Sequence, residues 1–518
     1  MNDQDAIAKH SRLTLAVSEQ IKGFHDSGKQ FRIYHGSTNS TRSDSTRHAD
    51  SSVSLVELKN ILSIDKEKLI VSAEPNVPFD ALLKATLAQG LVPPVVPEFP
   101  GITVGGAFAG SAGESSSFKY GFVDATVERI ECILGDGAPR EVGREDELFK
   151  AAAGTLGTIA VVTRLDIRLV KAEDYVELRY HLVTSFDDAV GTIVREGGPT
   201  SSNDFLDTIM YSPTKGAVIT GRMVDKSHTN KQQITRFTRR HDPWFYVHAE
   251  KMISNPPKPS KSTPKASPPS PSSSDSDNLR QPAIDYVPLT DYLFRYDRGG
   301  FWVGRFGFTY FSLPFIAPLR YIMDKYLHTR EMFHALHVSN QQQLYIVEDV
   351  AVPIPRAPGF LADLHSDLGI YPLWLCPLRF QETGLKIKHF PADTDTLLNV
   401  GVWGAVPKGK DYTGANRELE KRVRDCDGVK WLYAQMFYSE EEFWSIYDRE
   451  AYEALREKFG ATKSLPSVFD KIKQPPKKLE KKGIKGKVVG FWVFPGLYGL
   501  YKVWRGKDYI IERKQKTR

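Results

Sequence analysis

The sequence is poor in cysteine. Cys132, Cys376 and Cys426 are its three cysteines in 518 residues, and no two of them form a CxxC pair. This scarcity argues against a disulfide framework and against a zinc site, and it favours a reducing compartment. We therefore expect no metal centre.

Two further features are missing. No apolar run near the N-terminus is long enough for a signal peptide, because residues 1–12 are polar. No GxGxxG motif follows a predicted strand, which counts against a Rossmann domain and leaves no dedicated NADPH domain visible. With 41% hydrophobic and 25% charged residues, the composition is otherwise that of a globular protein of two or three domains.

Negative charge is scarce at the C-terminal end. Residues 463–518 contain 16 basic and 4 acidic side chains, whereas residues 1–462 contain 53 basic and 59 acidic ones. This basic tail includes an apolar block, residues 488–504, which is short and contains Pro495. We expect it to lie on an anionic membrane surface as an anchor. Nucleic acid is not an expected partner, because the aromatic residues form one block instead of spaced stacking positions.

Small residues crowd into residues 98–121, which read EFPGITVGGAFAGSAGESSSFKYG. Glycine takes positive φ without steric cost, and successive backbone N–H groups in such a loop can bind a pyrophosphate. A plain surface loop is the alternative. A second and weaker candidate for a phosphate-binding turn is the segment 36–41, directly after a predicted strand at 30–35.

The first 172 residues alternate short strands and helices. The pattern predicts an α+β nucleotide-binding unit with a hairpin at Asp136-Gly137. The predicted elements are strands at 69–74, 127–134 and 159–169 and helices at 78–89 and 145–153.

The remaining chain predicts a second sheet. Its expected elements are a helix at 185–195 and strands at 175–183, 216–224, 344–354, 397–403 and 431–438. Ser439 and Glu442 form a capping-box pattern that opens a helix ending at Phe459. Residues 254–278 are rich in Pro, Ser and Lys, and we expect a disordered insertion there. Residues 301–323 are rich in aromatic residues, but Arg and Pro interrupt them, so a membrane-spanning helix is not expected. Two interpretations stay open: a segment of the core, or a surface that contacts lipid.

Several motifs in this order resemble a known family. LIVSAEP, VPPVVPEFPGITVGGAFAG, ESSSFKYG and GTLGTIAVVTRLDIRL are similar to the FAD-binding domain of the vanillyl-alcohol-oxidase-type flavoproteins. DYVPLTDYLFRYDRG, IYPLWLCPLRF and FYSEEEFW narrow the resemblance to the Δ24-sterol reductases over roughly residues 50–473. The resemblance implies a two-subdomain FAD-binding (PCMH-type) domain at 1–172, followed by an α+β substrate or cap domain with an antiparallel sheet at 173–253 and 279–462.

The resemblance also implies which residues contact the cofactor. The expected FAD contacts are Gly36, Ser37, Thr38, Asn39 and Ser40 in the first turn, Glu98, Thr103, Val104, Gly105, Gly106 and Gly110 in the second, and Gly154, Gly157 and Ile159 on the adenine side. Histidine attachment of the flavin would need a histidine within the first turn. His35 precedes that turn, so we expect noncovalent FAD.

The activity implied is reduction of the side-chain Δ24 double bond of a sterol, with NADPH as a transient electron donor. An isolated alkene needs a proton donor, reduced flavin and a water-free aromatic pocket. Candidate acids are Glu114, Lys119, Tyr120, Asp349 and His389. Two alternatives stay open: an FAD-linked oxidase or dehydrogenase of an alcohol or secondary metabolite, and a non-catalytic membrane-associated flavoprotein.

The resemblance also bears on location. Animal and plant members of the family begin with a membrane helix that this chain lacks. Two interpretations of the basic tail stay open: it replaces that anchor, or it accompanies a changed substrate. We expect association with the cytosolic face of the endoplasmic reticulum.

Overall fold

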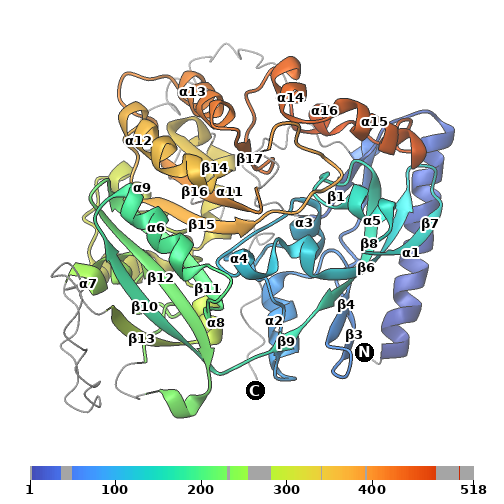
Figure 1. Ribbon diagram of the computed structural model, residues 1–518. Coiled ribbons are helices and arrows are strands. Elements are labelled where there is room, and N and C mark those ends of the chain that lie inside the picture. Colours follow the sequence, from blue (N-terminus) through green and yellow to red (C-terminus); the bar gives the residue numbers. More distant parts are fainter. Residues whose placement is uncertain are drawn as a thin grey trace.

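The computed structural model describes residues 3–36, 49–229, 234–254, 282–339, 341–390, 394–473 and 501. Two antiparallel sheets lie side by side in it, with helices packed around them (Figure 1). The predicted insertion at 254–278, apart from Ser254, and the apolar block at 488–504, apart from Tyr501, lie outside the described residues.

The first sheet has five antiparallel strands in the order β3-β4-β8-β6-β7. β6 and β7 form the hairpin predicted at Asp136-Gly137, and the strands and helices predicted in this unit are confirmed. Their bounds are β3 Ile61–Asp65, β4 Ile70–Ala73, α2 Phe79–Leu87, β6 Val127–Leu134, β7 Pro139–Gly143, α5 Glu147–Ala152 and β8 Ala160–Arg168.

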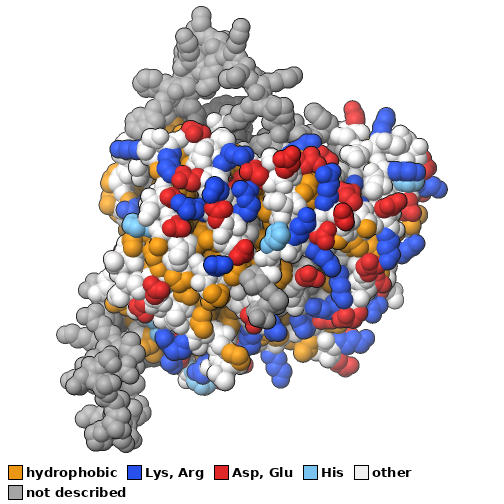
Figure 2. Space-filling model, turned by 45° about the horizontal axis from the view of Figure 1, so that its top comes forward, with side chains coloured by type: hydrophobic (Ala, Val, Ile, Leu, Met, Phe, Trp, Pro, Cys, Tyr) orange, Lys and Arg blue, Asp and Glu red, His pale blue; other side chains and the backbone are white. Residues whose placement is uncertain are grey.

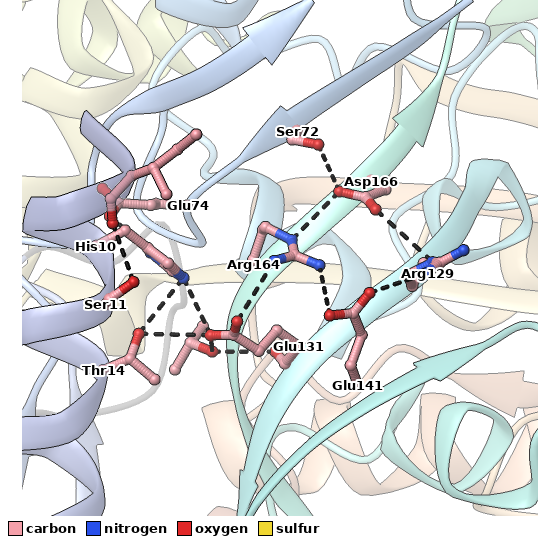
Figure 3. Close-up of polar contacts among 12 residues, drawn as sticks. His10, Ser11, Thr14, Ser72, Glu74, Arg129, Glu131, Glu141, Arg164 and Asp166 are labelled. Atoms are coloured by element: carbon pink, nitrogen blue, oxygen red, sulfur yellow. Dashed lines mark hydrogen bonds and ion pairs between the residues drawn. The ribbon is translucent and has the colours of Figure 1, made fainter. Parts of the chain in front are cut away.

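A long N-terminal helix, α1 (Asp3–Asp26), packs on this sheet and was not predicted. Val17 and Ile21 of α1 share a core cluster with Ile133 and Val161 of the sheet. His10 lies between two carboxylates, 2.9 Å from Glu74 and 3.0 Å from Glu131, within the polar cluster of Figure 3. Beside α1, the short parallel pair β1 (Arg32–Tyr34) and β2 (Ser52–Ser54) and the pair β5 (Leu91–Val92) and β9 (Val170–Lys171) complete this side.

The second sheet has eight strands in the order β13-β10-β12-β11-β15-β16-β14-β17, and all its pairings are antiparallel. The strands predicted at 175–183, 216–224, 344–354 and 397–403 are confirmed. The bounds are β10 Tyr175–Val183, β11 Phe205–Ser212, β12 Lys215–Val224, β13 Ala283–Pro288, β14 Tyr345–Pro353, β15 Leu373–Arg379, β16 Thr396–Ala405 and β17 Val429–Lys430.

Two predictions in this region are wrong. Residues 431–438 are not a strand, because pairing with β14 ends at Lys430 and Trp431 turns away to donate its indole N–H to Asn399 Oδ1 at 2.6 Å. The helix predicted at 439–459 is two helices, α14 (Glu440–Ile446) and α15 (Arg449–Lys458). Tyr447 is extended between them and pairs with Ile387, and Asp448 caps the second helix. The capping box of Ser439 and Glu442 is confirmed.

Helices cover both faces of the second sheet. α6 (Phe186–Glu196), α12 (Ala357–Asp367) and α13 (Tyr412–Asp425) bury one face, with Leu206, Val350 and Leu375 in their shared core. Basic and acidic side chains intermingle over the face shown in Figure 2. Arg417 of α13 pairs with Glu442 of α14 (Glu440–Ile446) at 3.2 Å. On the other face, α7 (Phe245–Ser254), α8 (Leu289–Leu293) and α9 (Val303–Tyr310) share a core with strands of this sheet. α10 (Ala317–Met323) and α11 (Thr329–Ser339) follow α9 in the chain.

One apolar core joins the two sheets. It contains Val71 and Leu165 of the first sheet together with Leu178 and Trp374 of the second. α16 (Val468–Ile472) returns the chain to the N-terminal unit, where Phe31 N–H donates to the Ser464 carbonyl at 2.8 Å. None of the described helices combines the length and the apolar character needed to cross a bilayer.

Candidate active site

A cavity of about 520 Å³ lies where the two sheets and the helical cover meet. The glycine-rich stretch forms one wall, and β14, β15 and β16 contribute a second through Asp349, Trp374 and Trp403. α9 and α11 contribute further apolar side chains, among them Phe306 and Met332. The cavity is therefore built from segments far apart in the sequence, with Arg32 and Lys473 as the first and last lining residues.

The glycine-rich stretch is partly a helix, not the loop that we expected. α3 (Val104–Ala109) begins after Thr103, whose hydroxyl accepts a hydrogen bond from Gly106 N–H at 3.2 Å. Gly105 is required by packing, because a Cβ there would lie 2.5 Å from Pro75 Cβ and 2.9 Å from the Pro75 carbonyl oxygen. Gly105 N–H donates to that carbonyl at 2.9 Å.

These bonds change the expected mode of anion binding. The N–H groups of Val104, Gly105, Gly106 and Gly110 all donate within the protein. These N–H groups are therefore not free to bind an anion. Because the residues are small, the stretch instead lets a ligand come close to its backbone.

Only some of the predicted cofactor residues line the cavity. Glu98, Thr103, Gly105, Gly106, Gly110 and Gly157 line the cavity. Val104 and Ile159 are fully buried and support this wall from within the core. Gly36 and Gly154 do not line the cavity; like Gly157, they have positive φ. Ser37, Thr38, Asn39 and Ser40 lie outside the described residues.

Basic side chains lie at one end of the cavity. Arg32 of β1 and Lys471 of α16 both contribute to the lining, and the Arg32 guanidinium donates to the Lys471 carbonyl at 3.1 Å. Sequence reasoning placed Lys471 in the tail and missed this contact, because nothing local in the sequence indicates that the two segments meet. An anionic group such as a diphosphate fits beside these charges.

Aromatic rings form the other end. Phe301 lies against Trp403 at 4.1 Å and Trp374 at 5.2 Å between ring centroids, and stacks on Tyr296 at 3.8 Å. Phe301 holds this position with a φ of 60°, which is unfavourable for a bulky residue.

A buried polar group holds the Trp374 ring. Asp207 Oδ2 accepts hydrogen bonds from the Trp374 indole at 3.0 Å, from Tyr296 at 2.7 Å and from Arg295 at 2.8 Å. Asp207 and Arg295 are both almost fully buried, so their charges offset each other away from water. The aromatic wall is thus fixed by an ion pair behind it.

Asp349 of β14 is the candidate acid that lines the cavity. Its carboxylate accepts hydrogen bonds from Asn399 at 3.1 Å and from the Tyr433 hydroxyl. Burial raises the pKa of Asp349 to about 6, although these hydrogen bonds favour the charged form. Asp349 therefore holds a proton at a higher pH than an ordinary aspartic acid.

The other four candidate acids lie outside the cavity lining. Glu114 is buried and accepts from Ser115 Oγ at 2.7 Å and Ser116 N–H at 2.8 Å, and burial raises its pKa. Lys119 pairs with Asp204 at 2.8 Å, not with Glu114. Tyr120 is half-buried, and His389 is exposed.

Glu98 is a further acid in the cavity, which the resemblance assigned to cofactor binding alone. Its carboxyl is buried in the cavity wall, and among the described residues Oε1 has no hydrogen-bond partner. Burial and the neighbouring Glu114 raise the pKa of Glu98 well above its usual range. An unsatisfied buried oxygen in a cavity wall fits a polar ligand atom, and with the basic end and the small-residue wall it makes this cavity suited to FAD.

Comparison with known proteins agrees with this assignment. Residues 14–143 match the family described as "FAD binding domain". The chain is 26% identical to a Delta(24)-sterol reductase homolog of Caenorhabditis elegans, over 89% of this chain and 87% of that protein. It is 27% identical to the Delta(24)-sterol reductases of Homo sapiens and Arabidopsis thaliana, over 81% and 82% of this chain and 77% and 76% of those proteins. The resemblance derived from the motifs is confirmed, and the chain carries an FAD-binding domain.

Proposed function

We propose that this chain is an FAD-dependent oxidoreductase that reduces the side-chain Δ24 double bond of a sterol. The observation that carries the proposal is the single cavity that joins the small-residue wall to an aromatic wall containing a protonatable carboxyl group, Asp349. The similarity to Δ24-sterol reductases over more than four-fifths of the chain supplies the substrate class.

FAD, when bound, supplies the hydride for this chemistry. Glu98, Thr103, Gly105, Gly106 and Gly110 would hold it along the small-residue wall, and Arg32 and Lys471 would neutralise its diphosphate. We expect noncovalent binding, and NADPH as the electron donor.

Side chains of the cavity can favour protonation of an isolated double bond. Protonation of a trisubstituted alkene places positive charge on its tertiary carbon, and adding hydride first would leave an unstabilised carbanion. Asp349 holds a proton in a site lined by Trp374, Trp403 and Phe301, whose ring faces stabilise a cation. The apolar lining excludes water that would otherwise trap the cation.

The alternative of an FAD-linked oxidase has weaker support. The chain is 27% identical to the Decaprenylphosphoryl-beta-D-ribose oxidase of Mycolicibacterium smegmatis, but over 33% of this chain only. Oxygen-dependent peroxide formation without a sterol would favour it. A non-catalytic flavoprotein would show neither peroxide formation nor sterol reduction.

A sterol substrate also accounts for membrane association. We propose that the basic tail at 463–518, with its apolar block at 488–504, contacts the membrane, at the cytosolic face of the endoplasmic reticulum. This tail lies outside the described residues beyond Lys473, except for Tyr501.

The decisive experiment is sterol profiling. A host that lacks Δ24 reduction is transformed with the wild-type chain or with Asp349→Asn, and its sterols are extracted. We expect the wild type to convert Δ24 sterols to their saturated side-chain forms and the variant to leave them. Unchanged sterols with a yellow, FAD-loaded wild-type protein would overturn the proposal.

A further inference from the structure

α10 presents an unusual concentration of exposed apolar side chains. Ile322 is 62% exposed, Ile316 48% and Tyr321 46%, and α10 itself contains no buried residue. No other seven-residue stretch of the described chain has three large apolar side chains this exposed. Such a patch indicates a surface that is covered by something apolar.

Positive charge surrounds this apolar face. Residues 301–330 contain a single carboxylate, Asp324, which is buried and pairs with Arg298 at 2.8 Å. Arg240 is exposed, lies 4.1 Å over the Tyr321 ring and donates to the Tyr321 carbonyl at 2.5 Å. Exposed Arg305 and Lys325 lie on either side of α10 in the sequence.

The same helix reaches the cavity. Met323, its last residue, lines the cavity, as do Tyr326 and Leu327 directly after it. Phe315, directly before Ile316, packs on Phe308, which also lines the cavity, with ring centroids 5.2 Å apart. The apolar face is therefore separated from the cavity by the width of one short helix.

We propose that the α10 face, defined by Ile316, Tyr321 and Ile322 with Arg240 and Lys325 beside it, is a surface that inserts into the headgroup region of an anionic lipid bilayer. Apolar side chains enter the bilayer while cations meet anionic headgroups, which is how a helix lies in a membrane interface. Met323, Tyr326 and Leu327 then bring the cavity wall close to the membrane, where a sterol is dissolved. This role deepens the proposed function. Only its purpose, access to a membrane-dissolved sterol, rests on that function; the binding of lipid does not.

The test uses the full-length, FAD-loaded chain, so that the C-terminal residues are present in every variant. In a Cys426→Ser background, an environment-sensitive fluorophore is attached at Ile322→Cys or, as the control, at Leu15→Cys of α1, which is 60% exposed. Vesicles of phosphatidylcholine, with or without phosphatidylserine, are added. We expect a blue shift at position 322 with phosphatidylserine vesicles and none at position 15.

A second measurement compares vesicle partitioning of Ile322→Glu with that of Leu15→Glu. Loss of one inserted Ile side chain should weaken partitioning about tenfold for the first variant and leave the second unchanged. The proposal is overturned by no shift at position 322, by equal shifts at both positions, or by equal partitioning of the two variants. A shift at 322 that follows protein concentration without vesicles would also overturn it, in favour of a second copy of the chain. Vesicle binding needs no turnover, so an intact shift without sterol reduction would count against the proposed function alone.

Discussion

At the residue scale, Asp349 is a carboxyl group kept where its charge is costly. Burial sets its pKa at about 6, so the proton-donating form is fully present below that pH and is lost as the pH rises through it. We expect the rate of sterol reduction to fall above pH 6. Asp349→Asn should lower kcat about 100-fold or more, because general-acid catalysis typically contributes that much, and should remove this pH dependence.

The control for Asp349 is Asp204→Asn, which removes the ion pair with Lys119 but keeps a side-chain oxygen that can accept from Met223 N–H. It should leave kcat unchanged. Flavin absorbance of both variants shows whether the cofactor is retained. A fully active Asp349→Asn variant would leave Glu98 as the acid to examine.

Gly105 gives a second prediction. A side chain there would meet Pro75, including its backbone oxygen, within 3 Å. Gly105→Val must displace α3 from the cavity wall, and we expect loss of bound FAD together with a destabilisation of about 1–3 kcal/mol. Gly191→Val in α6 is the matched control, since no atom lies within 4 Å of its added Cβ. Retained yellow colour in Gly105→Val would contradict this role of the α3 wall.

The sequence singled out Gly105 and Asp349, but it did not reveal the contacts that give them their roles. The motif containing Gly105 lies in the cavity wall, but its glycine is required by contact with Pro75, 30 residues earlier, which no local pattern reveals. Asp349 stood among five candidate acids, and burial in the tertiary structure distinguished it from Lys119 and His389.

At the scale of elements, α1 is held to the first sheet by a charged cluster. Burial alone disfavours the charged imidazole, but hydrogen bonds and charge from Glu131 and Glu74 outweigh it and raise the pKa of His10 to about 9. Burial likewise opposes ionisation of Glu131, yet the bond to His10 and the bond to Thr163 lower its pKa to about 2. Figure 3 shows the further partners, Arg164 among them.

The sign of the pH dependence follows from these shifts. A raised histidine pKa stabilises the fold fully below pH 6.5 and loses its effect as the pH rises through about 9. The lowered Glu131 pKa stabilises above pH 4.5 and loses its effect toward pH 2. We expect His10→Gln to destabilise by on the order of 2 kcal/mol at pH 6 and by much less at pH 10.

Thermal unfolding of the two proteins at both pH values checks this prediction. His25→Gln, near the other end of α1, is the control, because His25 is paired only loosely, at 3.5 Å, with the adjacent Asp26. An equal effect of His10→Gln at pH 6 and pH 10 would show that packing, not charge, holds the helix.

Elements with a clear periodicity of hydrophobic residues were predictable from the sequence. Elements whose ends depend on contacts with distant residues were not. β10 and the hairpin of β6 and β7 have local signals, alternation and a turn. Trp431 and Tyr433 have strand-like composition, yet their side chains are taken by Asn399 and Asp349 at the cavity, and no ladder forms. Tyr447 likewise ends α14 because Ile387 pairs with it.

At the scale of the whole molecule, the two sheets share a core, and the segment 464–471 packs against Phe31 and Arg32 of the N-terminal unit. Arg456 joins them by donating to the carbonyls of Thr158, Leu465 and Pro466 at 2.8–3.0 Å. The α+β class and the antiparallel second sheet were predicted from the sequence and the resemblance together. The meeting of β1 with α16 was not, because long-range pairing leaves no local trace.

The position of α16 decides where the tail can be cut. Tyr452 OH accepts from Val468 N–H at 2.8 Å, and Ile472 is buried, so the folded unit includes residues up to 472. Truncation after Lys473 therefore removes 13 of the 16 basic residues of the tail and spares the Arg32–Lys471 contact. We expect the truncated protein to retain FAD and its thermal stability.

Membrane attachment of the truncated protein should weaken, in a way that separates the two proposed contacts. Each lysine near an anionic surface contributes about 1 kcal/mol, and salt screens that attraction. Full-length protein should be partly released from membranes by high salt, with the remainder needing detergent. The truncated form should bind weakly, and Ile322→Glu in it should abolish the remaining binding if α10 inserts. Fractionation of cells expressing the three forms measures this. If the truncated protein sediments with membranes as fully as the intact one, the tail is not the main anchor, and the α10 face carries the attachment.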